Sequence, residues 1–361
     1  MISPPNWRSI FLGFGRRFKR IAWRFLHAAN PAAVIRTIGH MHTYIIQWVT
    51  RMARAPLVGA AGDVRPLGMA QARTLMTTRR IVQPGEPPAQ RVQWAEARGQ
   101  SFSFALEAGV PLLEAVRRGF AAAGFESGVL TIDGGAFGPF AYVMPALSKT
   151  PTHAAFYSDT FRPAGTTKLK AATLTFGERD GAPFFHCHGL WLEADGRLRA
   201  GHVLPEETVL AEACRADAFG LSGAGFVAGQ DPETNFRLFV PKAAPSAGRT
   251  ASARAFVLRL RPNQDFASTL EDFCRARGIV QARLRGGVGS IIGAHFEDGR
   301  RVEPFATELA VTSGWIRPHP QDGLAAELDI FLVDHLGGIA EGRLKRGDNP
   351  ILMTMELVLE A

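Results

Sequence analysis

The sequence has few of the features that mark disulfide-linked, secreted or membrane-spanning proteins. Its 361 residues include three cysteines, Cys187, Cys214 and Cys274, whose odd number and wide spacing exclude a disulfide framework. Its apolar runs are broken by Arg, Gln or Gly well before the roughly 18 residues that a transmembrane helix needs. No secretory signal with a small-residue cleavage site precedes the first charged segment. We therefore expect a cytoplasmic protein with no transmembrane segment.

Acidic residues are almost absent from the first 80 positions. Thirteen Arg and Lys stand there against one acid, Asp63, whereas the other residues carry 28 bases against 32 acids, so the net charge of +8 comes from the N-terminal part. Residues 7–25 alternate aromatic or apolar residues with bases at helical spacing, which predicts a basic amphipathic helix. Such a helix could contact nucleic acid, lie on an anionic membrane or dock on its own protein. Alternatively, the segment precedes a later start such as Met76.

Composition divides the chain into three parts. We expect residues 1–97 to form a basic extension and linker, partly helical or disordered, which ends in the turn-rich run 84–88. Alternating strand and helix patterns then predict a domain at 98–242 and, after a linker rich in Ala, Ser and Pro, a second domain at 254–361. Because the folded part is mildly acidic, we expect nucleic acid to bind only through residues 1–80.

The second domain repeats the first. Residues 256–260 match 102–106 at an offset of 154, and the Gly-Gly corner at 286–287 matches that at 134–135 at an offset of 152. Further on, residues 327–343 match 186–202 at an offset of 141, so the first copy has a connection that is longer by thirteen residues. The sequence therefore predicts a tandem duplication.

Three of the ten histidines, His186, His188 and His202, lie within seventeen residues on a predicted β-hairpin. If the hairpin closes through Ala194-Asp195-Gly196, with the glycine in the left-handed bulge position, His188 falls opposite His202. His186 then points to the same face, because side chains alternate along a strand. Three imidazoles on one face match the ligands of an open zinc-type site. A two-residue turn would instead send His202 to the opposite face, and a satisfied polar patch is the alternative interpretation.

The second copy gives an internal comparison for this cluster. At the positions of the three histidines it has Glu327, Asp329 and Arg343. A carboxylate and a guanidinium satisfy each other, and a fixed cation would repel a divalent metal. We therefore predict an ion pair between Asp329 and Arg343 and no metal in the second copy.

The H-x-H motif, the Asp-Gly turn and the following Gly-His, preceded by a Gly-Gly corner, resemble the bacterial form of the PPC domain (plants and prokaryotes conserved). The segments Gly286–Ser290 and Gly342–Pro350 extend this resemblance over about residues 98–361. It implies an α+β fold in which each of two tandem domains has an antiparallel sheet of about seven strands with a packed helix, assembled as a trimer. It also implies that His186, His188 and His202 are metal ligands. Plant relatives bind DNA through AT-hooks, whose Arg-Gly-Arg-Pro core is missing here.

Three functions remain open from the sequence. The first is a non-catalytic oligomeric module that binds a divalent metal, zinc above all, or a small ligand through the three histidines, with a regulatory role. The second is a DNA-associated regulator that uses the basic arm. The third is a metal-dependent hydrolase, for which Glu207 and Glu212 are the nearest general bases in the sequence; the proposed counterpart of Glu212 in the second copy, Glu356, favours a structural role for both. A pocket could be lined by His153, Tyr157, Arg162 and Glu212.

Overall fold

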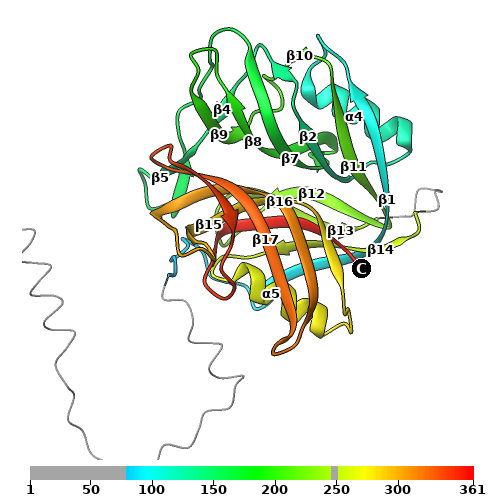
Figure 1. The fold of residues 1–361 in the computed structure, drawn as a ribbon, viewed down its shortest axis with the longest axis vertical. Coiled ribbons are helices and arrows are strands. Elements are labelled where there is room, and N and C mark those ends of the chain that lie inside the picture. Colours follow the sequence, from blue (N-terminus) through cyan, green and yellow to red (C-terminus); the bar gives the residue numbers. More distant parts are fainter. Residues whose placement is uncertain (1–78, 245–250) are drawn as a thin grey trace, which may run out of the picture. The chain divides into compact units, whose positions relative to one another are not determined.

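A computed structural model describes residues 79–244 and 251–361. This part of the chain forms two α-helices and nineteen strands (Figure 1). The predictions made for residues 1–78, including the basic amphipathic helix and any binding of nucleic acid through it, lie outside the described residues. In the part of the chain that is described, no helix is long and apolar enough to span a membrane.

The first half of the molecule, residues 92–244, packs a helix on one face of a mostly antiparallel sheet, in which β12 pairs with β7 in parallel. Helix α4 follows Pro111, whose fixed φ suits a helix start, and ends at Gly124 in the left-handed conformation (φ 77°). The elements of this half are β1 (Val92–Leu106), α4 (Leu112–Ala123), β2 (Gly128–Asp133), β3 (Ala136–Phe137), β4 (Tyr142–Val143), β5 (Pro145–Leu147), β6 (Ala155–Tyr157), β7 (Thr167–Arg179), β8 (Ala182–Leu192), β9 (Leu198–Val203), β10 (Leu210–Glu212), β11 (Cys214–Ser222), β12 (Ala224–Gln230) and β13 (Arg237–Ala243).

The second half, residues 251–361, has the same order of elements with fewer short strands. Its helix begins after Asp265, whose side chain accepts a hydrogen bond of 2.8 Å from the backbone N–H of Ser268 and so caps the first turn. The elements are β14 (Ala253–Leu260), α5 (Phe266–Arg275), β15 (Ala282–His295), β16 (Arg301–His319), β17 (Gly323–Asp334), β18 (Ile339–Arg343) and β19 (Ile351–Glu360).

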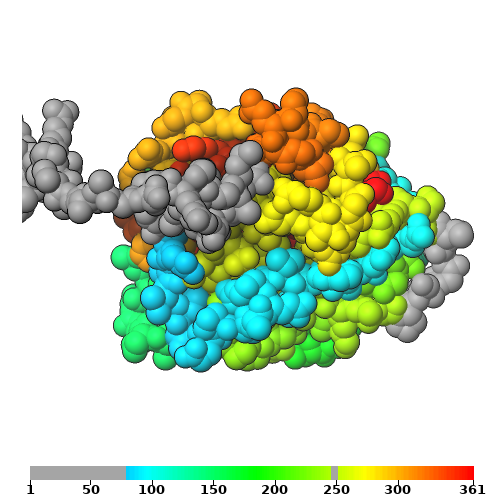
Figure 2. Space-filling model, turned by 90° about the horizontal axis from the view of Figure 1, so that it is seen from below, coloured from blue at the N-terminus to red at the C-terminus, as the bar shows by residue number. Residues whose placement is uncertain are grey.

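Strand β1 joins the two halves. Its first part, Val92–Gly99, pairs with β14 of the second half, and its second part, Arg98–Leu106, pairs with β11 of the first. All strands except β5 and β6 therefore belong to one hydrogen-bonded network of 17 strands. The expected boundary between residues 97 and 98 falls inside β1. Figure 2 shows this segment, in blue and cyan, on the surface beside the yellow residues of the second half.

Within this network, each half of the chain forms its own layer of strands. One face of each layer packs on the helix of that half, and the other face packs on the strands of the other half. Alternation along β8 places Phe185, Cys187 and Trp191 in the core under α4. The residues between them point the other way, and there Leu190 and Ala200 pack against a set from the second half: Val288, Ala310, Phe331 and Val333. The three histidines lie on this inner face, so the fold buries them between the two halves.

Candidate metal centre between the two halves

The hairpin formed by β8 and β9 has the predicted register. His188 is paired with His202, the Glu193 N–H donates to the Arg197 carbonyl oxygen at 3.0 Å, and Gly196 has a φ of 81°. This is the three-residue loop with a left-handed glycine that the sequence predicts. Because the loop fixes the register, the side chains of the three histidines share one face of the hairpin.

The three imidazole rings converge. One ligand atom from each of His186, His188 and His202 can be chosen so that all three lie within 4.8 Å of one another. The Nε2 atoms of His186 and His188 are 3.1 Å apart, and the ring centres of His186 and His202 are 4.8 Å apart. The side chains are 12%, 2% and 12% exposed in that order, so the cluster is nearly closed to solvent.

The second half of the chain orients two of these rings. The Nδ1–H of His188 donates to the backbone carbonyl oxygen of Leu309 at 2.7 Å. The Nδ1–H of His186 donates to Oε2 of Glu356 at 2.8 Å. A carbonyl oxygen can only accept, so Nδ1 of His188 carries the proton and its Nε2 presents a lone pair. Imidazoles that bind metals are typically held in this way by a carbonyl or carboxylate behind the ring.

A second carboxylate from the same half faces the histidines directly. Oε1 of Glu308, on β16, lies 3.8 Å from Nε2 of His188 and 4.0 Å from Nδ1 of His202. Within the described residues, neither Oε2 of Glu308 nor Nδ1 of His202 has a hydrogen-bond partner, although both are buried. Tyr157, on β6, closes one side, with its ring centre 5.2 Å from that of His202.

Burial controls the ionisation of the cluster. It lowers the pKa of His188 and of His202 well below the usual value, and the neighbouring histidines lower both further. Both rings are therefore neutral near pH 7, which is the form that binds metals. Burial also raises the pKa of Glu308 to about 8 and raises the pKa of Tyr157. Among the residues that the structure describes, no Lys or Arg forms an ion pair with the three histidines or with Glu308.

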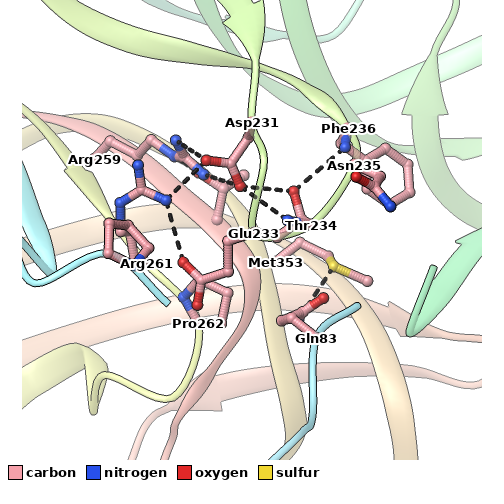
Figure 3. A network of polar contacts seen from close by, with 12 residues as sticks. Gln83, Asp231, Glu233, Thr234, Asn235, Phe236, Arg259, Arg261, Pro262 and Met353 are labelled. Atoms are coloured by element: carbon pink, nitrogen blue, oxygen red, sulfur yellow. Dashed lines mark hydrogen bonds and ion pairs between the residues drawn. The ribbon is translucent and has the colours of Figure 1, made fainter. Parts of the chain in front are cut away.

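A buried network of charged residues lies next to Glu356. Glu356 is paired across the sheet with Arg259. Arg259 and Arg261 both contact Asp231, at 3.1 and 2.8 Å, and Arg261 also contacts Glu233 at 3.1 Å (Figure 3). Asp231 and Glu233 come from the turn between β12 and β13, so the network ties the first half to β14. Arg259 also donates to Oγ1 of Thr354 at 3.2 Å, on the strand that carries Glu356.

The residues predicted to line a pocket do not come together. Of the four, Tyr157 reaches the histidine cluster. His153 packs on the rings of Phe156 and Phe236 with centres 4.7 and 4.8 Å away. Arg162 forms an exposed ion pair of 2.7 Å with Glu207, and Glu212 is exposed on β10. Glu207 and Glu212, the general bases that sequence order suggested, are thus surface residues.

The equivalent hairpin of the second half contains the predicted ion pair. Asp329 is paired with Arg343 in the register that His188 and His202 have in the first half. The guanidinium binds the carboxylate through two hydrogen bonds of 2.9 Å each, and Glu327 lies 3.5 Å from the same guanidinium. The Arg343 cation thus occupies the place that His202 has in the first half.

Glu308 and Glu356 were missed as site residues from the sequence. Strand registers place Leu106 opposite Cys214 and Leu260 opposite Met355, which makes Arg215, not Glu212, the counterpart of Glu356. A signal was nevertheless present, because each glutamate is a lone acid in an apolar strand, within Ala306–Val311 and Ile351–Leu359. A charge in such a run is rarely buried without a partner.

One known family model matches the second half of the chain. Residues 248–361 match the family model of the Plants and Prokaryotes Conserved (PCC) domain. The PCC match covers the half whose hairpin lacks histidines, and the resemblance to this family is thereby confirmed for that half. No protein with a curated description matches the chain.

Several solved structures align with about two fifths of the chain. A plant- and prokaryote-conserved protein from Pyrococcus horikoshii is 17% identical, with a TM-score of 0.33, over 40% of this chain and 94% of its own. A metal-containing protein from Archaeoglobus fulgidus is 19% identical, with a TM-score of 0.33, over 41% and 97%. A candidate DNA-binding protein from Ralstonia eutropha is 14% identical, with a TM-score of 0.29, over 38% and 88%.

Proposed function

We propose that this chain is a non-catalytic metal-binding module with a regulatory role, in which His186, His188 and His202 hold one divalent ion, zinc above all. The distance of 3.1 Å between the Nε2 atoms of His186 and His188 is the observation that carries the proposal. Both rings use Nδ1–H as a donor to the second half, so two lone pairs face each other. A shared proton or a metal cation must lie between them.

The donor set suits zinc. Zinc binds imidazole nitrogen at about 2.0–2.1 Å with tetrahedral geometry, which puts two ligand nitrogens roughly 3.3 Å apart. The unpartnered Nδ1 of His202 is a third donor, and nitrogen ligands favour zinc over magnesium or calcium. Once bound, the ion would supply the positive charge that balances the surrounding acceptors and would tie the first half to the second.

We further propose that the molecule is a tandem pair of PCC-like domains at 98–242 and 254–361, between which one site is divided. Strand pairing makes Arg215 the counterpart of Glu356. It also makes Lys168 the counterpart of Glu308, because Lys168 pairs with Leu192 and Glu308 pairs with Val333, the equivalent of Leu192. The first half thus has the histidines and lacks the acids. The second half has the acids and lacks the histidines. A duplication after which each half retained a different part of the site explains both differences.

Elemental analysis of the purified full-length chain tests the metal proposal. We expect one equivalent of zinc, or of another divalent transition metal, per chain after dialysis without chelator. Isothermal titration of the chelator-treated protein with zinc should give the same stoichiometry. A chain that neither retains a metal on purification nor binds zinc in the titration would overturn the proposal.

Two further proposals concern partners. The resemblance implies a trimer, and light scattering coupled to gel filtration measures the subunit number directly.

The +12 charge of residues 1–80 supports a second candidate function, association with DNA, because clustered Arg and Lys bind phosphates without sequence preference. Deletion of residues 1–75 should then abolish duplex binding at low salt; a full-length chain that binds no DNA, or a deletion with no effect, contradicts this candidate. A hydrolase, the third candidate, has no comparable support, because Glu207 and Glu212 are exposed.

A further inference from the structure

We infer that Glu308 is the fourth ligand of the ion, an anionic ligand that the second half supplies to the histidines of the first. The inference rests on the proposed metal-binding function and goes beyond it, because it assigns the position that a three-histidine site leaves open for water or a small ligand. It makes the site a closed one, built from both halves of the chain.

The surroundings of Glu308 are the first argument. Its side chain is 9% exposed, and its Oε2 atom has no hydrogen-bond partner among the described residues. The two nitrogens near Oε1 are those of His188 and His202, at 3.8 and 4.0 Å, which is too far for a hydrogen bond. A buried carboxylate without donors is strongly disfavoured unless a cation compensates it. Without an ion such a group takes up a proton instead, whereas a bound ion would supply the cation that compensates the carboxylate.

Distances to the histidines are the second argument. In a tetrahedral site with ligand bonds of about 2.0–2.2 Å, neighbouring ligand atoms lie roughly 3.3 Å apart. Oε1 of Glu308 lies 3.8 Å from Nε2 of His188 and 4.0 Å from Nδ1 of His202, less than about 1 Å beyond that separation in both cases. Within the described residues, Glu308 is the carboxylate that lies within 4.0 Å of both His188 and His202, whereas Glu356 contacts His186. Coordination by Glu308 would require its Oε1 atom to move closer to both rings.

The comparison between the halves is the third argument. The counterpart of Glu308 in the first half is Lys168, which is exposed. The counterparts of the histidines in the second half are Glu327, Asp329 and Arg343, which pair with one another. The three histidines and Glu308 thus occur together at the site between the halves. At the equivalent positions of the duplicate, the histidines and the glutamate are all replaced. A carboxylate that only packed against the hairpin would not be expected to change together with the histidines.

The metal-loaded wild-type chain gives the direct test. X-ray absorption at the zinc edge should show three imidazole ligands and one oxygen, and a crystal structure should place an oxygen of Glu308 at about 2.0–2.2 Å from the ion. An ion bound by the three histidines and a water, with Glu308 beyond bonding distance, overturns the inference and leaves the proposed function standing. Absence of any bound ion overturns both.

Substitution gives an independent test in solution. Glu308→Gln keeps the shape of the side chain and removes its charge. Loss of a hydrogen-bond partner behind a ligand lowers metal affinity by roughly 10–100-fold, and we expect loss of a ligand to lower zinc affinity at least as much. The visible spectrum of the cobalt(II)-loaded protein should change as an anionic ligand is lost. Glu341→Gln, at an exposed position of β18, is the matched control and should leave both unchanged. Wild-type affinity and an unchanged cobalt spectrum in Glu308→Gln would refute the assignment, and the wild-type X-ray experiment decides the question if this variant does not fold.

Discussion

Oε2 of Glu356 accepts a hydrogen bond of 2.8 Å from Nδ1–H of His186, a residue 170 positions earlier in the chain. One residue belongs to the half that carries the histidines, and the other to the half that lacks them. The contact shows that the candidate metal centre is not a property of the hairpin alone. Its histidines come from β8 and β9, and the groups that orient His186 and His188 come from β19 and β16.

Removal of a central ligand should abolish metal binding. His188 is the most buried histidine of the cluster, and its Nε2 atom lies 3.1 Å from Nε2 of His186. We expect His188→Ala to purify without metal and to lose the stabilisation by zinc, which is about 2.7 kcal/mol for a ligand at 100 times its Kd. Elemental analysis and thermal unfolding with and without zinc measure both effects. His335→Ala, in the turn after β17, is the control, and equal metal content in the two variants would contradict the assignment.

Loss of the outer hydrogen bond should weaken the site without destroying it. Glu356→Gln removes the charge that orients His186 and retains the shape of the side chain. We expect zinc affinity to fall by about 10–100-fold, the usual effect of an outer partner, with unchanged stoichiometry. Competition with a chromophoric chelator measures the affinity. An affinity equal to that of the wild type would mean that Glu356 serves only the buried charge network.

Contact between the halves can be tested at a glycine. Gly286 has a φ of +76°, and a methyl group there would lie 2.8 Å from Cβ of Val129 in the first half. Gly299 has a φ of +89° with open space around it, so alanine meets the same backbone strain at Gly299 but no clash. We expect Gly286→Ala to destabilise the protein by about 1–3 kcal/mol more than Gly299→Ala, the usual cost of overpacking. Urea unfolding compares the two; equal losses would show that the halves separate easily.

The buried network predicts a specific sensitivity to acid. Burial alone would raise the pKa of Asp231, but the hydrogen bonds and charge of Arg259, with further hydrogen bonds from Thr234 and Arg261, lower it to about 2 from an ordinary value of 3.8. A lowered carboxyl pKa means that its stabilisation is present above pH 4 and is lost as the pH falls through 2. The difference corresponds to about 2 kcal/mol.

Asp231→Asn isolates this contribution. The variant should be less stable than wild type by roughly 3–5 kcal/mol at pH 7, because it leaves buried arginines without their partner. Its disadvantage should shrink by about 2 kcal/mol when the pH is lowered from 5 to below 2. Denaturant unfolding at both pH values measures the change, and a disadvantage independent of pH would show that Asp231 does not titrate with folding.

The local structure of the site follows from the sequence. Ala194-Asp195-Gly196 defines a loop with one left-handed position, and the loop fixes the register that pairs His188 with His202. The same register in the second half pairs Asp329 with Arg343, as the residue types predict. The helix after Pro111 was predictable for a similar reason, since its start and its end at Gly124 depend on the backbone preferences of single residues.

Tertiary structure alone decided what the hairpin faces. The sequence suggested Glu207 and Glu212 as partners because they follow the histidines closely, whereas the fold places both at the surface and brings Glu308 and Glu356 from the other half. Spacing along the chain determines which side chains share a face, because strand geometry is local. It does not determine which sheet covers that face, because sheet packing joins residues far apart in the chain, here by contacts that span more than a hundred positions.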